Sequence, residues 1–164
     1  MTWKEFFIWS LSIIFKPKPK PPTPPITNEI QTLFNLHNAH RQTIGLHTLA
    51  FNVSLLSAAN KHSNWMYQNN KLSHYENNQN PGDRIRAEGY VYISYGENIA
   101  FGYLTAAKVF EGWLNSSGHR ANIENSGFRD IGLGMAGTYW TVVFGSQRGL
   151  TGKIHLPEGL KGNS

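Results

Sequence analysis

Six of the chain's eight prolines fall within the ten residues Lys16–Pro25, and this cluster limits the fold more than any other feature of the sequence. Proline fixes its φ angle and has no backbone N–H, so the segment fits neither a helix nor the interior of a sheet. Such a run favours a semi-rigid polyproline II conformation, which at about 3.1 Å per residue reaches roughly 30 Å. We therefore expect a tether that separates the first residues from a folded part beginning near Ile26.

An apolar segment, Phe6–Phe15, precedes the tether. It is too short to cross a bilayer, which takes about 20 residues. Three interpretations stay open: an uncleaved anchor in a membrane interface, a hydrophobic plug for a protein partner, and a weak export signal. The expected organisation is an arm over residues 1–25, one domain over residues 26–149, and a loose glycine-rich tail over residues 150–164.

Composition limits what the folded part can do. The chain has 164 residues, 40% of them hydrophobic, which is enough for one domain with its own core. Four lysines and one glutamate lie in residues 1–25, so +3 of the formal charge of +5 belongs to the arm. The remainder has no basic stripe, and we expect no nucleic-acid binding. The absence of cysteine excludes disulfides, thiolate metal sites and cysteine nucleophiles.

Hydrophobic periodicity predicts helices first and strands last. The predicted helices run from Thr27 as N-cap to Gly45, from Ser54 to Asn70, from Asp83 as N-cap to Gly89, and from Thr105 to Asn115. The predicted strands are Val91–Tyr95, Ile131–Met135 and Tyr139–Phe144, with a hairpin turn at Gly137-Thr138. This order predicts an α+β fold, a small and mostly antiparallel sheet with helices on both faces. The aromatic residues expected in its core are Trp113, Tyr139 and Trp140.

Three polar segments contain residues that suit chemistry. His74 follows the second helix, Glu97 lies between a strand and a loop, and His119 follows a helix end. Two imidazoles and a carboxylate are the minimum for a three-ligand zinc site with an open position. They could equally form an acid–base pair in which Glu97 orients an imidazole. Ser116 and Ser117 lie near His119, but the sequence identifies no oxyanion hole or orienting acid for a serine nucleophile.

Six short motifs occur in a fixed order and carry a family resemblance. They are His37-Asn-Ala-His-Arg41, Leu72-Ser-His74, Gly96-Glu-Asn-Ile99, Trp113-x-x-Ser116, Gly118-His-Arg-Ala-Asn-Ile123 and Ile131-Gly-Leu-Gly134. Each is weak alone, but in this order they resemble the CAP superfamily, also called SCP-like domains (cysteine-rich secretory proteins, antigen 5 and pathogenesis-related 1 proteins). The cysteine-free sequence is similar to bacterial and phage members. The resemblance implies a three-layer α-β-α sandwich with a central cleft.

The resemblance also implies site residues. His74 and Glu97 match the first histidine and the glutamate of the family's cleft. The family's second acid would fall at Ser116 and its second histidine near Thr138, so the sequence departs from the four-residue pattern there. His119 is expected to supply a replacement imidazole. The expected site is then His74, Glu97 and His119, which would hold Zn²⁺ or act as catalytic residues in an enzyme.

Other polar residues are expected to be structural. Buried polar groups need partners, so a polar network should fix the helices to the sheet. The residues expected in this network are His37, Asn38, Arg41, Asn98 and Asn122. The remaining histidines of the folded part, expected at the surface or half-buried, are His40, His47 and His62.

Three functions stay open. The favoured one is a recognition domain held on an envelope or particle by its arm, with a cleft that binds a lipid, peptide or glycan, with or without a metal. Replacing Glu97 with glutamine would then leave the fold intact. The second is a zinc-dependent, peptidase-like hydrolase acting on a cell-envelope polymer. The third is a structural component of a phage virion docked through residues 1–25. The expected location is extracellular, on the cell envelope or in a virion.

Overall fold

The computed structural model describes residue 24 and residues 26–147, so the expected arm and tail lie outside the described residues. The elements are, in chain order, α2 (Asn28–Thr43), β1 (Ala50–Phe51), α3 (Val53–Asn69), α4 (Pro81–Ala87), β2 (Ser94–Phe101), α5 (Ala106–Leu114), α6 (Ser117–Ile123), β3 (Asp130–Ala136) and β4 (Tyr139–Ser146). Within the described ranges, no helix is both long and apolar enough to cross a membrane.

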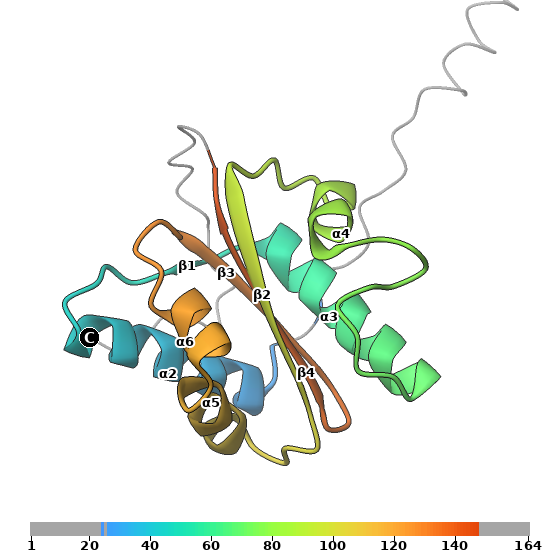
Figure 1. Cartoon of the computed structure of the whole chain (residues 1–164), viewed down its shortest axis with the longest axis horizontal. Helices are drawn as coiled ribbons and strands as arrows, with labels where there is room; N and C mark the ends of the chain where they lie inside the picture. The colour runs from blue at the N-terminus through green and yellow to red at the C-terminus, as the bar shows by residue number, and fades with distance from the viewer. Residues whose placement is uncertain (1–23, 25, 148–164) are drawn as a thin grey trace, which may run out of the picture.

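The strands form one mixed sheet in the order β1-β3-β4-β2, so the last two strands among the described residues lie at its centre. β2 and β3 both run antiparallel to β4, and β1 adds a short parallel pairing to β3. Helices α2, α5 and α6 cover one face and α3 covers the other (Figure 1). The predicted α+β fold with three layers is confirmed.

The spacing between α3 and the sheet is set by two residues of β3 that lack a side chain. A Cβ atom on Gly132 would lie 2.1 Å from the backbone carbon of Leu55, and one on Gly134 would lie 2.4 Å from that of Ala59. The atoms in the way belong to the helix backbone, which cannot avoid the clash by changing rotamer as a side chain can. The alternation of glycine with larger residues in β3 therefore lets the helix lie directly on the strand.

The large residues of β3 point into the main core on the opposite face. Ile131 and Leu133 pack there with residues of α2, α5 and α6. The two tryptophans expected in the core, Trp113 and Trp140, are 2% and 0% exposed, and Tyr139 is 4% exposed. Their placement in the core is confirmed.

Local capping decides where the helices begin. Thr27 accepts the N–H of Ile30 and caps α2 as predicted. The predicted start of α4 at Asp83 is wrong, because Asn80 is the N-cap and Pro81 occupies the first helical position. The side chains of Asn80 and Asp83 each accept the other's backbone N–H, which forms a capping box. Pro81 therefore begins the helix, at a position where its missing N–H would have no intrahelical partner.

The predicted strand Val91–Tyr95 begins and ends too early, because β2 starts at Ser94 and continues through Glu97 and Asn98. These polar residues stay in the strand because they have partners in the fold. The carbonyl of Ile99 accepts from Nε1 of Trp113, and the carbonyl of Glu97 accepts from Nδ2 of Asn122, both at 3.3 Å. Side chains of α5 and α6 thus bond backbone groups of an edge strand that would otherwise stay unpaired.

Two of the expected network residues fasten α2 to neighbouring segments. Arg41 is fully buried and donates to the carbonyls of Ile123 and Asn125, where α6 ends. Carbonyls at a helix C-terminus lack intrahelical partners, and a cation suits them. The side chain of Asn38 bonds both the N–H and the carbonyl of Leu49, at 2.8 and 3.1 Å.

His37 has a different environment from these two residues. Its ring is 0% exposed and packs against Phe110, Trp113 and Phe144. Nδ1 lies 2.7 Å from the carbonyl of Leu33 in the same helix. Nε2 is buried without a hydrogen-bond partner in the described part of the chain. The ring therefore fills an apolar space and does not link α2 to another element by a hydrogen bond.

We expect His37 to make the fold sensitive to acid. Burial, more than any neighbouring charge, lowers the pKa of this ring from 6.5 to about 4. The unfolded chain takes up the proton at higher pH than the folded one, so stability is lost as pH falls from about 6.5 to about 4. The difference corresponds to about 3 kcal/mol.

Replacing His37 with phenylalanine should remove that part of the pH dependence. Urea unfolding of both proteins at about pH 7 and about pH 4.5 gives the free energy of unfolding at each pH. The wild type should lose more of this free energy between the two pH values than the variant. Equal losses in the wild type and the variant would contradict the prediction.

Candidate functional site

Glu97 is a buried carboxylate in the middle of β2, with 2% of its side chain exposed. Its Oε1 lies 2.8 Å from Nδ1 of His74, and its Oε2 lies 2.5 Å from Nη2 of Arg84. Burying a charge is costly unless the charge is paired and hydrogen-bonded. Arg84, whose side chain is 6% exposed, supplies the opposite charge. Glu97 is therefore an internal carboxylate with both oxygens occupied, and not a residue between a strand and a loop as expected.

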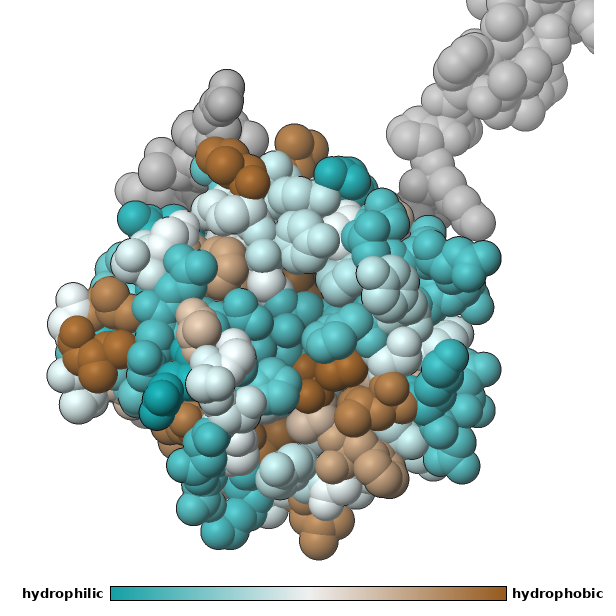
Figure 2. Space-filling view, viewed as in Figure 1, coloured by the Kyte–Doolittle hydropathy of each residue, from teal (hydrophilic) through white to brown (hydrophobic). Residues whose placement is uncertain are grey.

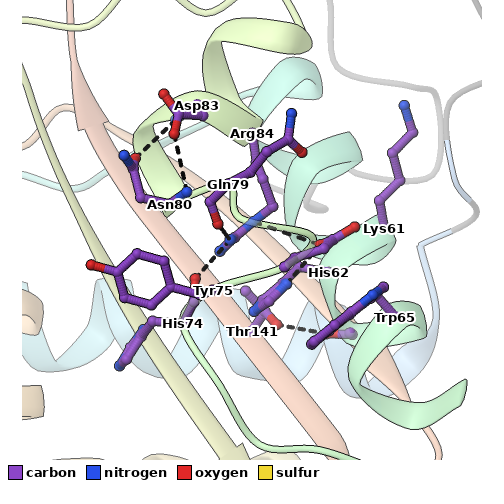
Figure 3. A network of polar contacts seen from close by, with 12 residues as sticks. Lys61, His62, Trp65, His74, Tyr75, Gln79, Asn80, Asp83, Arg84 and Thr141 are labelled. Atoms are coloured by element: carbon purple, nitrogen blue, oxygen red, sulfur yellow. Dashed lines mark hydrogen bonds and ion pairs between the residues drawn. The ribbon is translucent and has the colours of Figure 1, made fainter. Parts of the chain in front are cut away.

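His74 reaches Glu97 from the loop between α3 and α4, and 48% of its side chain is exposed. Because the carboxylate accepts at Nδ1, the neutral ring keeps its proton on Nδ1 and a lone pair on Nε2. Figure 3 shows the ring pointing away from Arg84 and from the buried side chains. The fold therefore presents one oriented imidazole nitrogen at the surface.

His119 lies within α6, where the sequence analysis expected a position after a helix end. Nδ2 of Asn98 donates to the carbonyl of His119 at 3.0 Å, and Oδ1 of Asn98 accepts from Asn122 at 2.8 Å. Burial, and to a lesser extent the nearby imidazole of His74, lowers the pKa of the His119 ring. The two imidazoles are thus neighbours electrostatically, while the hydrogen bonds described here join only His74 to Glu97.

Arg84 connects Glu97 to a second group of charged residues, part of which is seen around Arg84 and His62 in Figure 3. Arg84 donates to the carbonyl of His74 at 2.7 Å, and its Nε lies 3.9 Å from Oε2 of Glu76. The same oxygen of Glu76 lies 2.8 Å from Nδ1 of His62. The sequence analysis named neither Arg84 nor Glu76 and gave His62 no part in the site.

His62 was expected at the surface or half-buried, and this expectation is wrong because its ring is 0% exposed. The signal was its position on the apolar face of the second helix, in line with Ala59 and Met66. His47 is exposed and His40 is partly buried, as expected. His40 pairs with Glu124 at 2.9 Å.

The two serines beside His119 begin α6, with Ser116 as N-cap and Ser117 as the first helical residue. Among the described hydrogen bonds, neither hydroxyl contacts an imidazole. A serine nucleophile needs an adjacent base, so this arrangement offers no activated serine.

The expected three-ligand zinc site does not fit this geometry. Both oxygens of Glu97 are held by His74 and Arg84, and the carboxylate is closed off from solvent. The residues that the structure describes contain no group of three histidine, aspartate or glutamate side chains placed to hold a metal ion. Two imidazoles alone are one ligand short of the set that zinc sites use. Glu97 orients His74, and zinc binding stays a prediction that this donor set does not favour.

Comparison with known proteins agrees with the architecture. A family model described as CAP, the cysteine-rich secretory protein family, matches residues 34–144. The uncharacterized protein YkwD of Bacillus subtilis is 38% identical over 112 residues, which cover 66% of this chain and 44% of YkwD. The uncharacterized membrane protein YlbC of the same organism is 38% identical over 120 residues, covering 72% of this chain and 34% of YlbC. The chain therefore spans less than half the length of these relatives.

Solved structures share the fold. An extracellular protein containing an SCP domain from Bacillus anthracis aligns with a TM-score of 0.70 and 31% identity, over 76% of this chain and 45% of that one. An outer surface protein of Borrelia burgdorferi aligns with a TM-score of 0.71 and 21% identity, over 76% of this chain and 97% of that one.

Proposed function

Because this chain belongs to the CAP family of cysteine-rich secretory proteins, we propose that it is an extracellular recognition domain that binds a ligand at His74. The observation that carries the proposal is the fixed, half-exposed ring of His74. Its Nδ1 is bonded to a carboxylate that is itself buried and paired. A few precisely held polar atoms beside apolar surface are what ligand sites use for orientation and specificity.

The extracellular location is supported by the relatives. The similar protein from Bacillus anthracis is described as extracellular, and the one from Borrelia burgdorferi as an outer surface protein. YlbC is described as a membrane protein. We carry over only the location outside the cytoplasm, because these descriptions belong to other and mostly longer chains.

The chemistry of the site defines the ligand. The lone pair on Nε2 of the neutral His74 ring accepts a hydrogen bond, so the ligand must bring a donor such as a hydroxyl or an amide N–H. Apolar surface is available beside it, since Leu72 and Tyr75 are 50% and 64% exposed. Figure 2 shows polar side chains over the middle of this face and apolar ones gathered below, toward the β3–β4 hairpin. A peptide- or glycan-containing polymer of the cell envelope offers both kinds of group.

The proposal is tested by cosedimentation of the full chain with purified peptidoglycan sacculi. We expect the wild type to bind and a His74→Ala variant to bind about five- to tenfold more weakly, because one ligand hydrogen bond is worth about 1 kcal/mol. His40→Ala is the matched control, since His40 also pairs with a glutamate but lies on α2. Equal binding by wild type and His74→Ala would reject His74 as the binding residue.

A hydrolase is the second candidate, favoured by the same carboxylate–imidazole pair. An imidazole oriented by a carboxylate can act as a general base toward water, within hydrogen-bond reach of its substrate. His74 would be that base and Glu97 its orienting partner. The two candidates separate in the same incubation. Release of soluble fragments that stops in His74→Ala would establish the hydrolase, whereas binding without release supports recognition.

A further inference from the structure

His62 faces a hydrogen-bond acceptor at each of its ring nitrogens. Nε2 lies 2.8 Å from the carbonyl oxygen of Ser73, and Nδ1 lies 2.8 Å from Oε2 of Glu76. A carbonyl oxygen only accepts, so Nε2 carries a proton. The contact between Nδ1 and a carboxylate requires a second proton between those two atoms. The His62 side chain is 0% exposed, so solvent does not take the place of either partner.

The charges around His62 indicate that the second proton belongs to its ring. Glu76, whose side chain is 16% exposed, joins the buried His62 to the buried pair of Arg84 and Glu97, because Arg84 lies 3.9 Å from Glu76 and 2.5 Å from Glu97. A neutral His62 would leave this group with two negative charges and one positive charge. A doubly protonated His62 balances it, and unbalanced buried charge is strongly unfavourable.

Neighbouring groups are consistent with a cationic ring. Trp65 stacks on His62 with ring centroids 5.9 Å apart and planes inclined by 8°, and an indole face attracts cations (Figure 3). Lys61 and Glu88 border a pocket of about 70 Å³ beside Glu76. They form an ion pair with each other and so leave the balance of charge unchanged.

We propose that His62 is a positioning residue whose doubly protonated ring, together with Arg84, fixes the loop that carries His74. His62 holds the carbonyl of Ser73 at 2.8 Å, and Arg84 holds the carbonyl of His74 at 2.7 Å. His62 on α3 and Arg84 on α4 thus donate hydrogen bonds to the two peptide groups on either side of His74. With the backbone held at both points, the ring is directed toward Glu97.

Arg84 supplies the positive charge that pairs with Glu97, so His74 contributes a hydrogen bond from Nδ1 and keeps Nε2 free of that contact. The inference rests on the proposed function for its purpose, because a fixed His74 is useful only if a ligand binds there. The protons on His62 and His74 are properties of the free protein and are measured without a ligand.

Nitrogen NMR of the histidine rings in the full chain tests the assignment near neutral pH. In the wild type we expect protons on both ring nitrogens of His62, and on Nδ1 but not Nε2 of His74. A wild-type His62 with a single ring proton would overturn the assignment. This measurement needs no variant, so it decides the question even if a substitution prevents folding.

Two variants then test the positioning role. In Glu76→Gln the amide can donate to Nδ1, so His62 should lose one ring proton while His74 keeps its proton on Nδ1. In His62→Leu the carbonyl of Ser73 is released, and the His74 proton should become shared between Nδ1 and Nε2. His40→Leu is the control and should change neither ring.

An unchanged His74 in a folded His62→Leu protein would overturn the positioning role. Sacculus binding is measured separately on the same samples. If NMR finds the expected protons on His62 and His74 but the wild type binds no sacculi, the proposed function is contradicted. The positioning role of His62 is then still supported.

Discussion

Replacing Gly132 with alanine is expected to destabilise the fold by more than about 4 kcal/mol, or to prevent folding altogether. The added Cβ would lie 2.1 Å from the backbone carbon of Leu55 and 2.3 Å from the backbone nitrogen of Leu56. Relief would require α3 to move off β3 along its length, and this contact is the most extensive between a helix and the sheet. Urea unfolding monitored by tryptophan fluorescence measures the change.

Gly118→Ala is the matched control for this prediction. Gly118 lies in α6, and a Cβ atom there meets nothing within 4 Å. Alanine is favoured over glycine in a helix by about 1 kcal/mol, so this variant should be as stable as the wild type or more so. A Gly132→Ala protein that unfolds within about 1 kcal/mol of the wild type would show that α3 does not lie as close to β3 as described.

Breaking the buried pair of Arg84 and Glu97 is expected to have the next largest effect. Either Arg84→Met or Glu97→Gln leaves the other charge inside the protein without its main partner, which costs about 3–5 kcal/mol. Glutamine at position 97 should therefore destabilise the fold, contrary to the expectation from the sequence. A function test based on Glu97 would confuse loss of binding with loss of stability, whereas the half-exposed His74 avoids this problem.

A double-mutant cycle isolates the pair. The double variant Arg84→Met/Glu97→Gln removes both charges, so it should lose clearly less stability than the sum of the two single variants. Lys108→Met is the control, because Lys108 and Glu111 pair at 72% and 60% exposure and such surface pairs contribute about 1 kcal/mol or less. Additive losses at positions 84 and 97 would contradict a direct interaction.

Capping residues, which are local signals in the sequence, account for most of the helix starts. Thr27 and Thr105 cap α2 and α5 where the sequence predicts a start, because a cap depends on the next three residues only. The start of α4 was misplaced because Asn and Asp are both favoured as N-caps, and the sequence prediction chose the second of two candidates three residues apart. Asn80 is the N-cap here, and Asp83 returns the bond.

The position of β2 could not be read from local sequence. Gly96-Glu97-Asn98 is polar and resembles a loop, yet it lies in the sheet because Arg84 and Asn122 supply partners from distant parts of the chain. The same limit applies to the site. Motif order indicated His74 and Glu97, and the structure joins them, but the charges that hold them come from residues whose burial depends on the complete fold.

The sheet order has a consequence for how the protein is made. β4 is the last strand of the part of the chain that the structure describes, and both β2 and β3 bond to it. A polypeptide still emerging from the ribosome, without Tyr139–Ser146, has no partner for β2 and no complete surface for α3 to cover. Because long-range pairing comes last, the nascent protein should remain protease-sensitive until synthesis passes that strand, and then become protected in a single step.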